Sequence, residues 1–328
     1  MKNIYFSELN DSNRWHLFLP YAWGLLRSRS EIDLEITAAY AWQIPFFRPA
    51  SIDEIVGQVE DPSVFGFSCY VWNWNTHIEI ARKIKLRFPN CLIVFGGPHV
   101  PKHDTEFFKK YPWVDLLVLG EGEAAFCEIL KNNLLPSKNW GQVPGISINQ
   151  DGQRHDTPPR PRTKDLSQSA SPYLLGYYDE IIADLKARGL RWSALIETNR
   201  GCPYGCTYCD WGSATNAKVH FKELEIINQE IDFLTRSGVH ILSTTDANFG
   251  MFPRDVEIVT RVAQQKKSLN SPSYFYVQMA KAWSSHAWNI SDILIKNQLT
   301  FGVPLSLQSL NVTTLKEIKR INIHRSGY

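Results

Sequence analysis

The sequence lacks any window near the roughly 18 consecutive apolar residues that a membrane-spanning helix needs. Its first eight residues, Met1–Glu8, also lack the apolar stretch of a secretory signal peptide. Neither sign of charge dominates, because 35 Lys and Arg residues face 33 Asp and Glu residues. These absences predict a soluble, cytoplasmic protein for which neither nucleic acid nor a membrane is the main partner.

Cysteine is also scarce, with six residues in a chain of 328, which is too large to need disulfide bridges for stability. Half of these cysteines lie within eight residues of one another, a crowding that indicates metal ligation. Apolar residues make up 44% of the chain and charged residues 21%, which is typical of a globular protein. At roughly 100–200 residues per domain, the length predicts two domains.

Short apolar runs alternate with helical patterns over residues 1–150. The expected strands are Ile4–Phe6, Leu34–Tyr40, Val64–Val71, Cys91–Phe95 and Val114–Leu119. Such alternation predicts an α/β domain with a Rossmann-like, doubly wound parallel sheet that carries helices on both faces. A hairpin is expected near Pro144–Asn149, where Asp151 and Gly152 form a turn. Residues 151–190 are rich in proline and predict an interdomain linker.

A second alternation occupies residues 191–328. The expected strands are Ser193–Glu197, Val239–Thr244, Tyr274–Gln278 and Gly302–Leu307. Each is followed by a helical pattern, which gives about four β/α units. Loops after the strands of such a barrel form its functional site. We therefore expect a partial β/α barrel whose site lies at the carboxyl ends of its strands.

Three closely spaced cysteines follow the first strand of this second domain: Cys202, Cys206 and Cys209. Thiolates suit iron–sulfur clusters or zinc. Structural zinc normally takes four ligands, for which His220 would be the fourth candidate. A [4Fe–4S] cluster held by three thiolates instead leaves one iron open to bind a small molecule. Gly201, Pro203 and Gly205 would let the loop wrap tightly. The spacing favours the open cluster over zinc or inert thiols.

This C-x3-C-x2-C loop, with the aromatic Tyr208 just before its third cysteine, resembles the signature of the radical S-adenosylmethionine superfamily. The resemblance covers about Trp192 to Tyr328. It implies that Cys202, Cys206 and Cys209 ligate the cluster and that S-adenosylmethionine chelates the open iron. Electron transfer would then cleave the sulfonium to methionine and a 5′-deoxyadenosyl radical. Tyr208 would contact the adenine, although packing beside the cluster is an alternative role.

The same resemblance assigns polar residues at two other strand ends. Asp246 and Asn248 fall where the superfamily holds the methionine amine, although its usual Gly-Gly-Glu is missing. Capping or turn formation is the alternative role for both. Ser306 and Gln308 fall at the end of the expected fourth strand, where the superfamily contacts the adenosyl or methionine part. Ordinary strand-end polarity would explain them equally well.

Glycine-bearing segments follow three expected strands of the first domain, where open α/β sheets bind ligands. They are Gly66-Phe67-Ser68-Cys69-Tyr70, Gly96-Gly97-Pro98-His99 and Gly120-Glu121-Gly122-Glu123. In this order ahead of the cysteine loop, they resemble the cobalamin-binding domain of B12-dependent radical enzymes. The resemblance covers about residues 1–135. It implies that Ser68, Cys69, Gly96, Gly97, Pro98, Gly120, Glu121 and Gly122 surround cobalamin.

The D-x-H-x-x-G motif, in which a histidine ligates cobalt, is absent. The resemblance therefore implies that the corrin binds with its own base displaced and with no histidine on cobalt. His99 is expected to be a loop residue, and Cys69 and Cys91 to be core residues. Loss of corrin binding, which would leave a vestigial domain, is the alternative.

The resemblance implies a cobalamin-dependent methyltransferase that acts on an unactivated carbon or phosphorus of a small-molecule or natural-product-like substrate. A reducing donor such as flavodoxin or ferredoxin would supply the electron. The alternatives are a radical cyclase or rearrangement enzyme of the Mg-protoporphyrin ester cyclase type, and a non-catalytic iron–sulfur protein. Because the superfamily usually builds about six β/α units, the chain is expected to be C-terminally incomplete, and another chain would complete the barrel.

Overall fold

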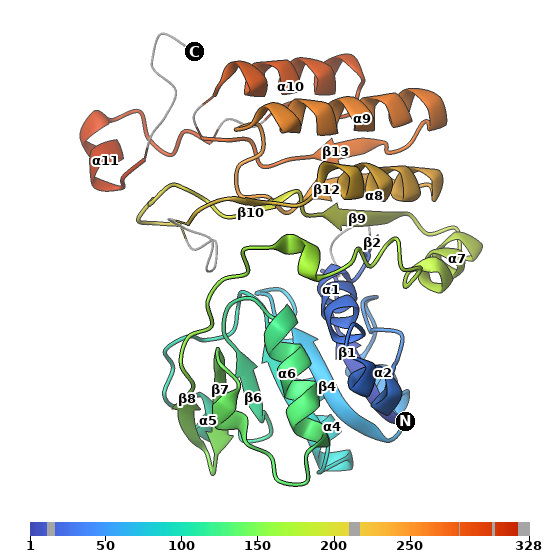
Figure 1. Ribbon diagram of the computed structural model, residues 1–328, viewed down its shortest axis with the longest axis vertical. Coiled ribbons are helices and arrows are strands. Elements are labelled where there is room, and N and C mark those ends of the chain that lie inside the picture. The colour runs from blue at the N-terminus through green and yellow to red at the C-terminus, as the bar shows by residue number, and fades with distance from the viewer. Residues whose placement is uncertain (12–16, 210–216, 282, 304–305, 321–328) are drawn as a thin grey trace. The chain divides into compact units, whose positions relative to one another are not determined.

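The computed structural model describes residues 1–11, 17–209, 217–281, 283–303 and 306–320 (Figure 1). The chain divides into two compact units. The first unit comprises Met1–Thr163 and Gln168–Tyr177, and the second unit comprises Lys164–Ser167 and Tyr178–Tyr328. Among the helices of the described residues, none is long and apolar enough to cross a bilayer.

A seven-stranded sheet forms the centre of the first unit, with the order β3-β1-β4-β5-β6-β7-β8. Its strands are β1 (Lys2–Ser7), β3 (Tyr40–Trp42), β4 (Pro62–Ser68), β5 (Leu92–Gly96), β6 (Leu116–Val118), β7 (Ile146–Gln150) and β8 (Gln153–Asp156). The strands from β3 to β6 are parallel, whereas β7 and β8 form an antiparallel hairpin. Positive φ angles at Asp151 and Gly152 close its turn, as expected. The short strand β2 (Leu17–Phe18) also belongs to this unit.

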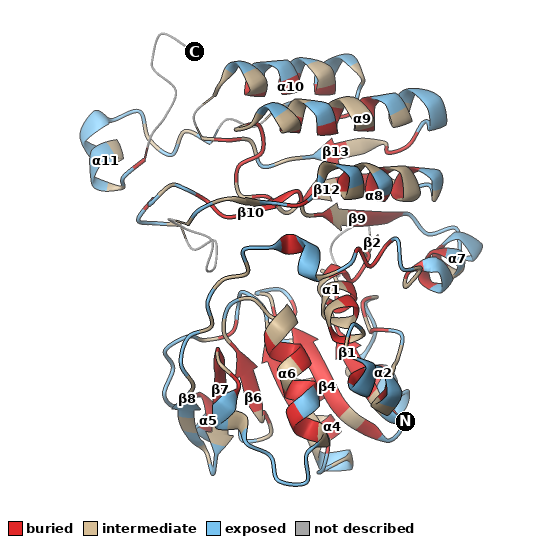
Figure 2. Ribbon diagram, viewed as in Figure 1, coloured by how far each residue is buried: buried red, intermediate tan, exposed pale blue. Residues whose placement is uncertain are grey.

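Helices cover both faces of this sheet, which confirms the doubly wound architecture. They are α1 (Tyr21–Ser30), α2 (Leu34–Ala39), α3 (Ile52–Gly57), α4 (Trp74–Arg87), α5 (Phe107–Lys110) and α6 (Glu123–Leu134), with a 3-10 turn, η1 (Trp140–Gln142). Successive strand residues face opposite sides. Phe65 and Ile93 belong to a core with α3, α4 and α5, whereas Val64 and Val94 belong to a core with α2 and α6. Figure 2 shows β4 buried over most of its length.

The strand expected at Leu34–Tyr40 is wrong for most of its length, because Leu34–Ala39 forms helix α2 and the strand begins only at Tyr40. The Asp33 side chain caps this helix by accepting hydrogen bonds from the backbone N–H groups of Glu35 at 3.0 Å and Ile36 at 3.3 Å. Leu34 is 82% exposed, so the alternation of apolar residues there does not mark a buried sheet face.

The second unit contains a parallel sheet in which β12 (Ile241–Thr244) lies between β9 (Trp192–Ile196) and β13 (Tyr274–Tyr276). Its helices are α7 (Asp179–Ala187), α8 (Leu224–Arg236), α9 (Pro253–Leu269), α10 (Ser285–Lys296) and α11 (Val312–Glu317). A 3-10 turn, η2 (Leu166–Gln168), begins in this unit and ends at the first residue of the segment Gln168–Tyr177, which belongs to the first unit. A small antiparallel pair, β10 (Asn199–Arg200) with β11 (His220–Phe221), brackets the cysteine loop. The expected β/α alternation is therefore confirmed for three strands.

The fourth strand expected at Gly302–Leu307 is not formed by its described residues, 302–303 and 306–307, and residues 304–305 lie outside the described part. The segment 151–190 contains β8 and α7. Its proline-rich portion is held to α6 by Arg160, which donates to both carboxylate oxygens of Glu128 at 2.9 and 2.6 Å. The domain bounds 1–150, 151–190 and 191–328 stay a prediction.

Candidate functional site

A cavity of about 170 Å³ opens at the carboxyl ends of the strands of the first unit. Strands β1, β4, β5 and β6, the loops that follow the last three, and helices α1 and α6 supply its walls. The lining residues are Phe6, Ala22, Leu25, Leu26, Gly66, Phe67, Ser68, Tyr70, Val94, Gly96, Gly97, Val118, Gly120, Gly122, Glu123 and Phe126. The walls are mostly apolar, which is typical of small-molecule sites with few polar contacts.

Two of the lining glycines are required by close packing. A Cβ atom on Gly66 would lie 2.5 Å from Cδ2 of Phe6, so this position brings the β4 backbone against the Phe6 ring. At Gly97, φ is +100°, and a Cβ atom would lie 2.8 Å from both the backbone N and O of Cys69. No other residue type fits Gly97 without strain.

The structure brings most of the predicted cofactor residues of the first unit to this cavity, namely Ser68, Gly96, Gly97, Gly120 and Gly122. Cys69, Pro98 and Glu121 are not among the lining residues. The Cys69 side chain packs in the core that the sheet forms with α3, α4 and α5, and its Sγ lies 3.9 Å from Nδ1 of His77. Burial raises the pKa of its thiol.

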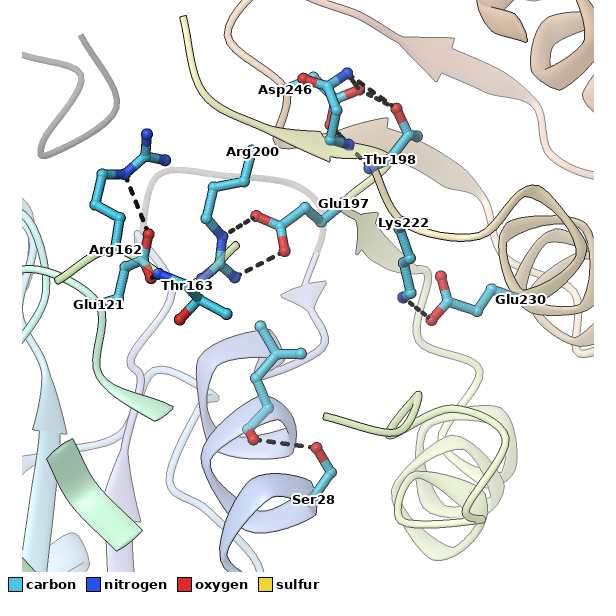
Figure 3. A network of polar contacts seen from close by, with 12 residues as sticks. Ser28, Glu121, Arg162, Thr163, Glu197, Thr198, Arg200, Lys222, Glu230 and Asp246 are labelled. Carbon is cyan, nitrogen blue, oxygen red and sulfur yellow. Dashed lines mark hydrogen bonds and ion pairs between the residues drawn. The ribbon is translucent and has the colours of Figure 1, made fainter. Parts of the chain in front are cut away.

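Glu121 is engaged in contacts within the first unit. It accepts a hydrogen bond from the backbone N–H of Thr163 at 2.7 Å and pairs with Arg162 at 3.3 Å (Figure 3). His77 is fully buried, with its Nε2 3.0 Å from Oγ of Ser7. Burial lowers the pKa of His77 to about 3, so the ring is neutral. These contacts give Cys69, Glu121 and His77 structural roles.

The cysteine loop of the second unit begins at a sharply restricted backbone position. Gly201 has φ +131°, and a Cβ atom there would collide with the backbone oxygen of Lys218. The backbone N–H of Ala217 donates to the oxygen of Cys202 at 2.8 Å, next to the β10–β11 pair. The loop entrance is thus fixed by backbone contacts that only glycine permits at residue 201.

Asp246, at the carboxyl end of β12, is fully buried and holds this entrance (Figure 3). Its carboxylate accepts from the backbone N–H of Thr198 at 2.9 Å, the backbone N–H of Asn199 at 3.2 Å and Nδ2 of Asn199 at 3.0 Å. The Thr198 hydroxyl donates to it as well. Burial raises the pKa of Asp246 to about 7, although these hydrogen bonds act to lower it. Both carboxylate oxygens therefore already have protein partners.

The sulfur atoms of Cys202 and Cys206 contact polar side chains. Both cysteines are buried, whereas Cys209 is half-buried. Asn248 donates from Nδ2 to Sγ of Cys202 at 3.1 Å, and its buried Oδ1 has no hydrogen-bond partner. Lys281 donates to Sγ of Cys206 at 3.3 Å. Burial acts to raise the pKa of Cys206, but the hydrogen bond and charge of Lys281 bring it below its ordinary value.

Among the described residues, no three side chains of His, Cys, Asp or Glu already converge on one point suited to a metal ion. Cys202 and Cys206 share the Lys281 ammonium group. The backbone N–H of Cys209 donates to the oxygen of Cys206 at 3.2 Å. Three thiols on one loop, beside a cation and an unpartnered amide oxygen, nevertheless form a donor set that fits an iron–sulfur cluster.

Tyr208 is 46% exposed, and its hydroxyl accepts from Nη1 of Arg320 at 3.2 Å. The same guanidinium donates to the backbone oxygen of Ser306, so the structure brings Tyr208 and Ser306 to one cation. Gln308 adopts a left-handed backbone with φ +63°.

Sequence reasoning missed both Lys281 and Arg320. A cation just after a strand end was the available signal for Lys281, whereas Arg320 has no local signal.

Comparison with known proteins places these two sites in context. Residues 36–130 match the family model of the B12 binding domain. The chain is 41% identical over 327 residues to the cobalamin-dependent radical SAM methyltransferase TokK of Streptomyces tokunonensis. It is 38% identical over 327 residues to the 2-(S-pantetheinyl)-carbapenam-3-carboxylate methyltransferase of Streptantibioticus cattleyicolor. Each match covers 100% of this chain and 47% of the relative, so the chain spans about half the length of these relatives.

A solved structure shares the fold. The radical S-adenosylmethionine methyltransferase TsrM from Kitasatospora setae superposes with a TM-score of 0.70 at 16% identity, covering 98% of this chain and 62% of that one. This likeness agrees with a Rossmann-like unit that precedes a partial β/α barrel with a cysteine loop after its first strand. Over its whole length the chain is therefore similar to cobalamin-dependent radical S-adenosylmethionine enzymes, and residues 36–130 match their B12 binding domain.

Proposed function

We propose that this chain is the cofactor-binding part of a radical S-adenosylmethionine methyltransferase. The observation that carries the proposal is the pair of buried thiols, Cys202 and Cys206, which share a lysine at the carboxyl end of the barrel strands. Cys202, Cys206 and Cys209 would hold a [4Fe–4S] cluster. When bound, that cluster supplies the electron that cleaves S-adenosylmethionine.

Asn248 is the described residue best placed to orient the methionine part of S-adenosylmethionine. Its Nδ2 already donates a hydrogen bond to the Cys202 sulfur, and its buried Oδ1 remains an acceptor without a partner. A buried acceptor without a partner is costly, so a ligand ammonium group would stabilise it. The half-exposed ring of Tyr208, held at its hydroxyl by Arg320, offers a flat surface for adenine.

Asp246 has a supporting role in this proposal. Its carboxylate is saturated by Thr198 and Asn199, which makes it an anchor for the loop entrance. Ser306 and Gln308 stay candidates for contacts with the adenosyl part. Ser306 is the better placed of the two, because its backbone oxygen is fixed by the same Arg320 that holds Tyr208.

The cavity of the first unit would receive part of cobalamin. Its volume of about 170 Å³ and its apolar, glycine-rich walls suit a flat ring system such as the displaced base of cobalamin. Ser68, Gly96, Gly97, Gly120 and Gly122 would contact it, while Cys69 and Glu121 would support the walls from outside.

Methyl transfer to an unactivated carbon of a small-molecule substrate is favoured by the two relatives that match the whole chain. The second candidate is radical cyclisation. The anaerobic magnesium-protoporphyrin IX monomethyl ester cyclase of Synechocystis is 31% identical, but over only 169 residues. A low-potential donor such as flavodoxin or ferredoxin would provide the electron, and a further chain segment would complete the barrel wall.

Anaerobic reconstitution with iron and sulfide tests the cluster site. Wild type should bind four irons per chain, as a [4Fe–4S] cluster requires, and give its EPR signal on reduction. Cys202→Ser, Cys206→Ser and Cys209→Ser should each lose most of the iron. Cys127→Ser is the matched control, because Cys127 lies on α6 of the first unit. Full iron content in Cys206→Ser would contradict the proposal.

Cobalamin binding is tested separately by gel filtration after incubation with hydroxocobalamin. Wild type should retain the cofactor, and Gly120→Leu should not, because a leucine would fill space that is open beside Gly120. Circular dichroism establishes that the variant is folded. Equal retention by the folded variant and by wild type would exclude the cavity as the binding site.

A further inference from the structure

Lys281, in the loop that follows β13, points a charged group at the cysteine loop. Its Nζ lies 3.3 Å from Sγ of Cys206 and 3.9 Å from Sγ of Cys202. The same ammonium group stands 4.9 Å from the ring centroid of Tyr204, a distance at which cation and ring attract each other. The side chain thus contacts two of the three thiols and the aromatic residue between them.

The backbone that carries Lys281 is fixed. A parallel bridge joins Phe249 to Met279 just beyond β12 and β13. The backbone N–H of Phe249 donates to the oxygen of Gln278 at 2.7 Å, and that of Ala280 donates to the oxygen of Phe249 at 2.8 Å. Ala280 is itself buried. These contacts place the Cα of residue 281 beside the loop, so a long cationic side chain there reaches the sulfurs without a large rearrangement.

Within the described residues, the charge of Lys281 is not balanced by an acidic side chain. Among the described residues, no Asp or Glu forms an ion pair with Lys281, whereas Lys222 in the same unit is paired with Glu230. The Lys281 side chain is half-buried, so water screens its charge only in part. Its positive charge is therefore directed at the sulfur side of the loop.

We propose that Lys281 is the charge partner of the cluster on its Cys202–Cys206 side, and that its positive charge raises the reduction potential of the cluster. This inference rests on the function proposed above. Reduction adds one electron, taken from an external low-potential donor, to a group whose thiolates are already negative. A cation within hydrogen-bonding distance of two of those sulfurs stabilises the reduced form more than the oxidised form. Lys281 acts through the ligands and is a positioning and tuning residue.

The test is a reductive titration of the reconstituted chain in the absence of S-adenosylmethionine. The EPR signal of the reduced cluster reports how far reduction has proceeded at each potential. Lys281→Met keeps the length of the side chain and removes its charge. We expect a roughly tenfold smaller equilibrium constant for one-electron reduction, a fall of ~59 mV in the midpoint. Lys281→Arg keeps the charge and should stay within about threefold of wild type. Lys296→Met, an exposed lysine of α10, is the matched control and should leave the midpoint unchanged.

Iron content separates the possible failures. If wild type binds no iron, the proposed function fails as a whole. If Lys281→Met binds iron like wild type and its midpoint is unchanged, only the inference about Lys281 is overturned. An unchanged midpoint together with a weaker affinity for S-adenosylmethionine would instead assign Lys281 to binding the carboxylate group of S-adenosylmethionine. Lys281→Gln provides the same neutral comparison with a polar group if the methionine variant folds poorly.

Discussion

Replacing Asp246 with alanine should destabilise the second unit by an amount that depends on pH. The carboxylate accepts hydrogen bonds from two backbone N–H groups, those of Thr198 and Asn199, which cannot rotate toward other partners. Each buried donor left unsatisfied costs about 1–3 kcal/mol, so we expect a loss of roughly 2–6 kcal/mol where the carboxyl group is protonated in the folded state.

The pH dependence follows from the direction of the pKa change. Burial raises the pKa of Asp246 from 3.8 to about 7. A carboxyl group whose pKa is higher in the folded state keeps its proton longer there, so its contribution to stability falls as pH rises from about 4 to about 8. This change in pKa corresponds to ~4 kcal/mol over that window. Since the alanine variant lacks this fall, its deficit should be largest near pH 4 and should shrink toward pH 8.

Hydrogen exchange of the β9 and β12 amides measures this deficit without requiring the two units to unfold together. Wild type and variant are compared at pH 5 and pH 8 in the same metal state, after correction for the intrinsic pH dependence of exchange. Asp246→Asn, which retains one acceptor oxygen and cannot titrate, should show the same shrinking deficit. A deficit of equal size at both pH values would refute the reasoning.

Other substitutions test separate parts of the structure. Gly97→Ala should cost at least ~1–2 kcal/mol in thermal or chemical unfolding, because φ is +100° and the Cβ would meet the Cys69 backbone. Lys222→Met should cost ~3–5 kcal/mol by leaving Glu230 buried without its cation, and the double variant with Glu230→Leu should recover most of this loss in urea unfolding. Asn248→Ala should weaken S-adenosylmethionine binding to the reconstituted chain roughly tenfold in equilibrium dialysis, and unchanged affinity would count against its proposed role.

Regular elements with strong periodicity could be predicted from the sequence. The helix α6, Glu123–Leu134, is of this kind, because its apolar face and terminal charges are local properties of the sequence. Helix α2 was missed because its decisive feature is a single capping side chain, Asp33, rather than a periodic pattern. The region from Gly302 to Leu307 contains strand-forming residues, but the pairing that would define a strand is not a local property.

The sites were predictable to a different degree. Glycines after parallel strands identified most of the cavity, because the carboxyl ends of such strands meet at one edge. The spacing of Cys202, Cys206 and Cys209 identified the loop. The contacts of Asp246 with Thr198 and of Lys281 with Cys206 join residues 48 and 75 positions apart. Such contacts depend on how neighbouring strands pair, so a local pattern can single out the individual residues but not the contacts between them.

The anchoring of the loop entrance by Asp246 also bears on the order of folding and metal capture. In small zinc-dependent domains the ligands become ordered only when the metal binds, so chelation unfolds the domain. Here Thr198 and Asn199 are ordered by protein contacts, namely the pairing of β9 with β12 and the hydrogen bonds to Asp246, so we expect their ordering to need no iron. Cys202 and Cys206 would therefore be presented together by a finished scaffold, and Cys209 would complete the coordination last. Removal of the metal by a chelator should leave the second unit folded and ready to be loaded again.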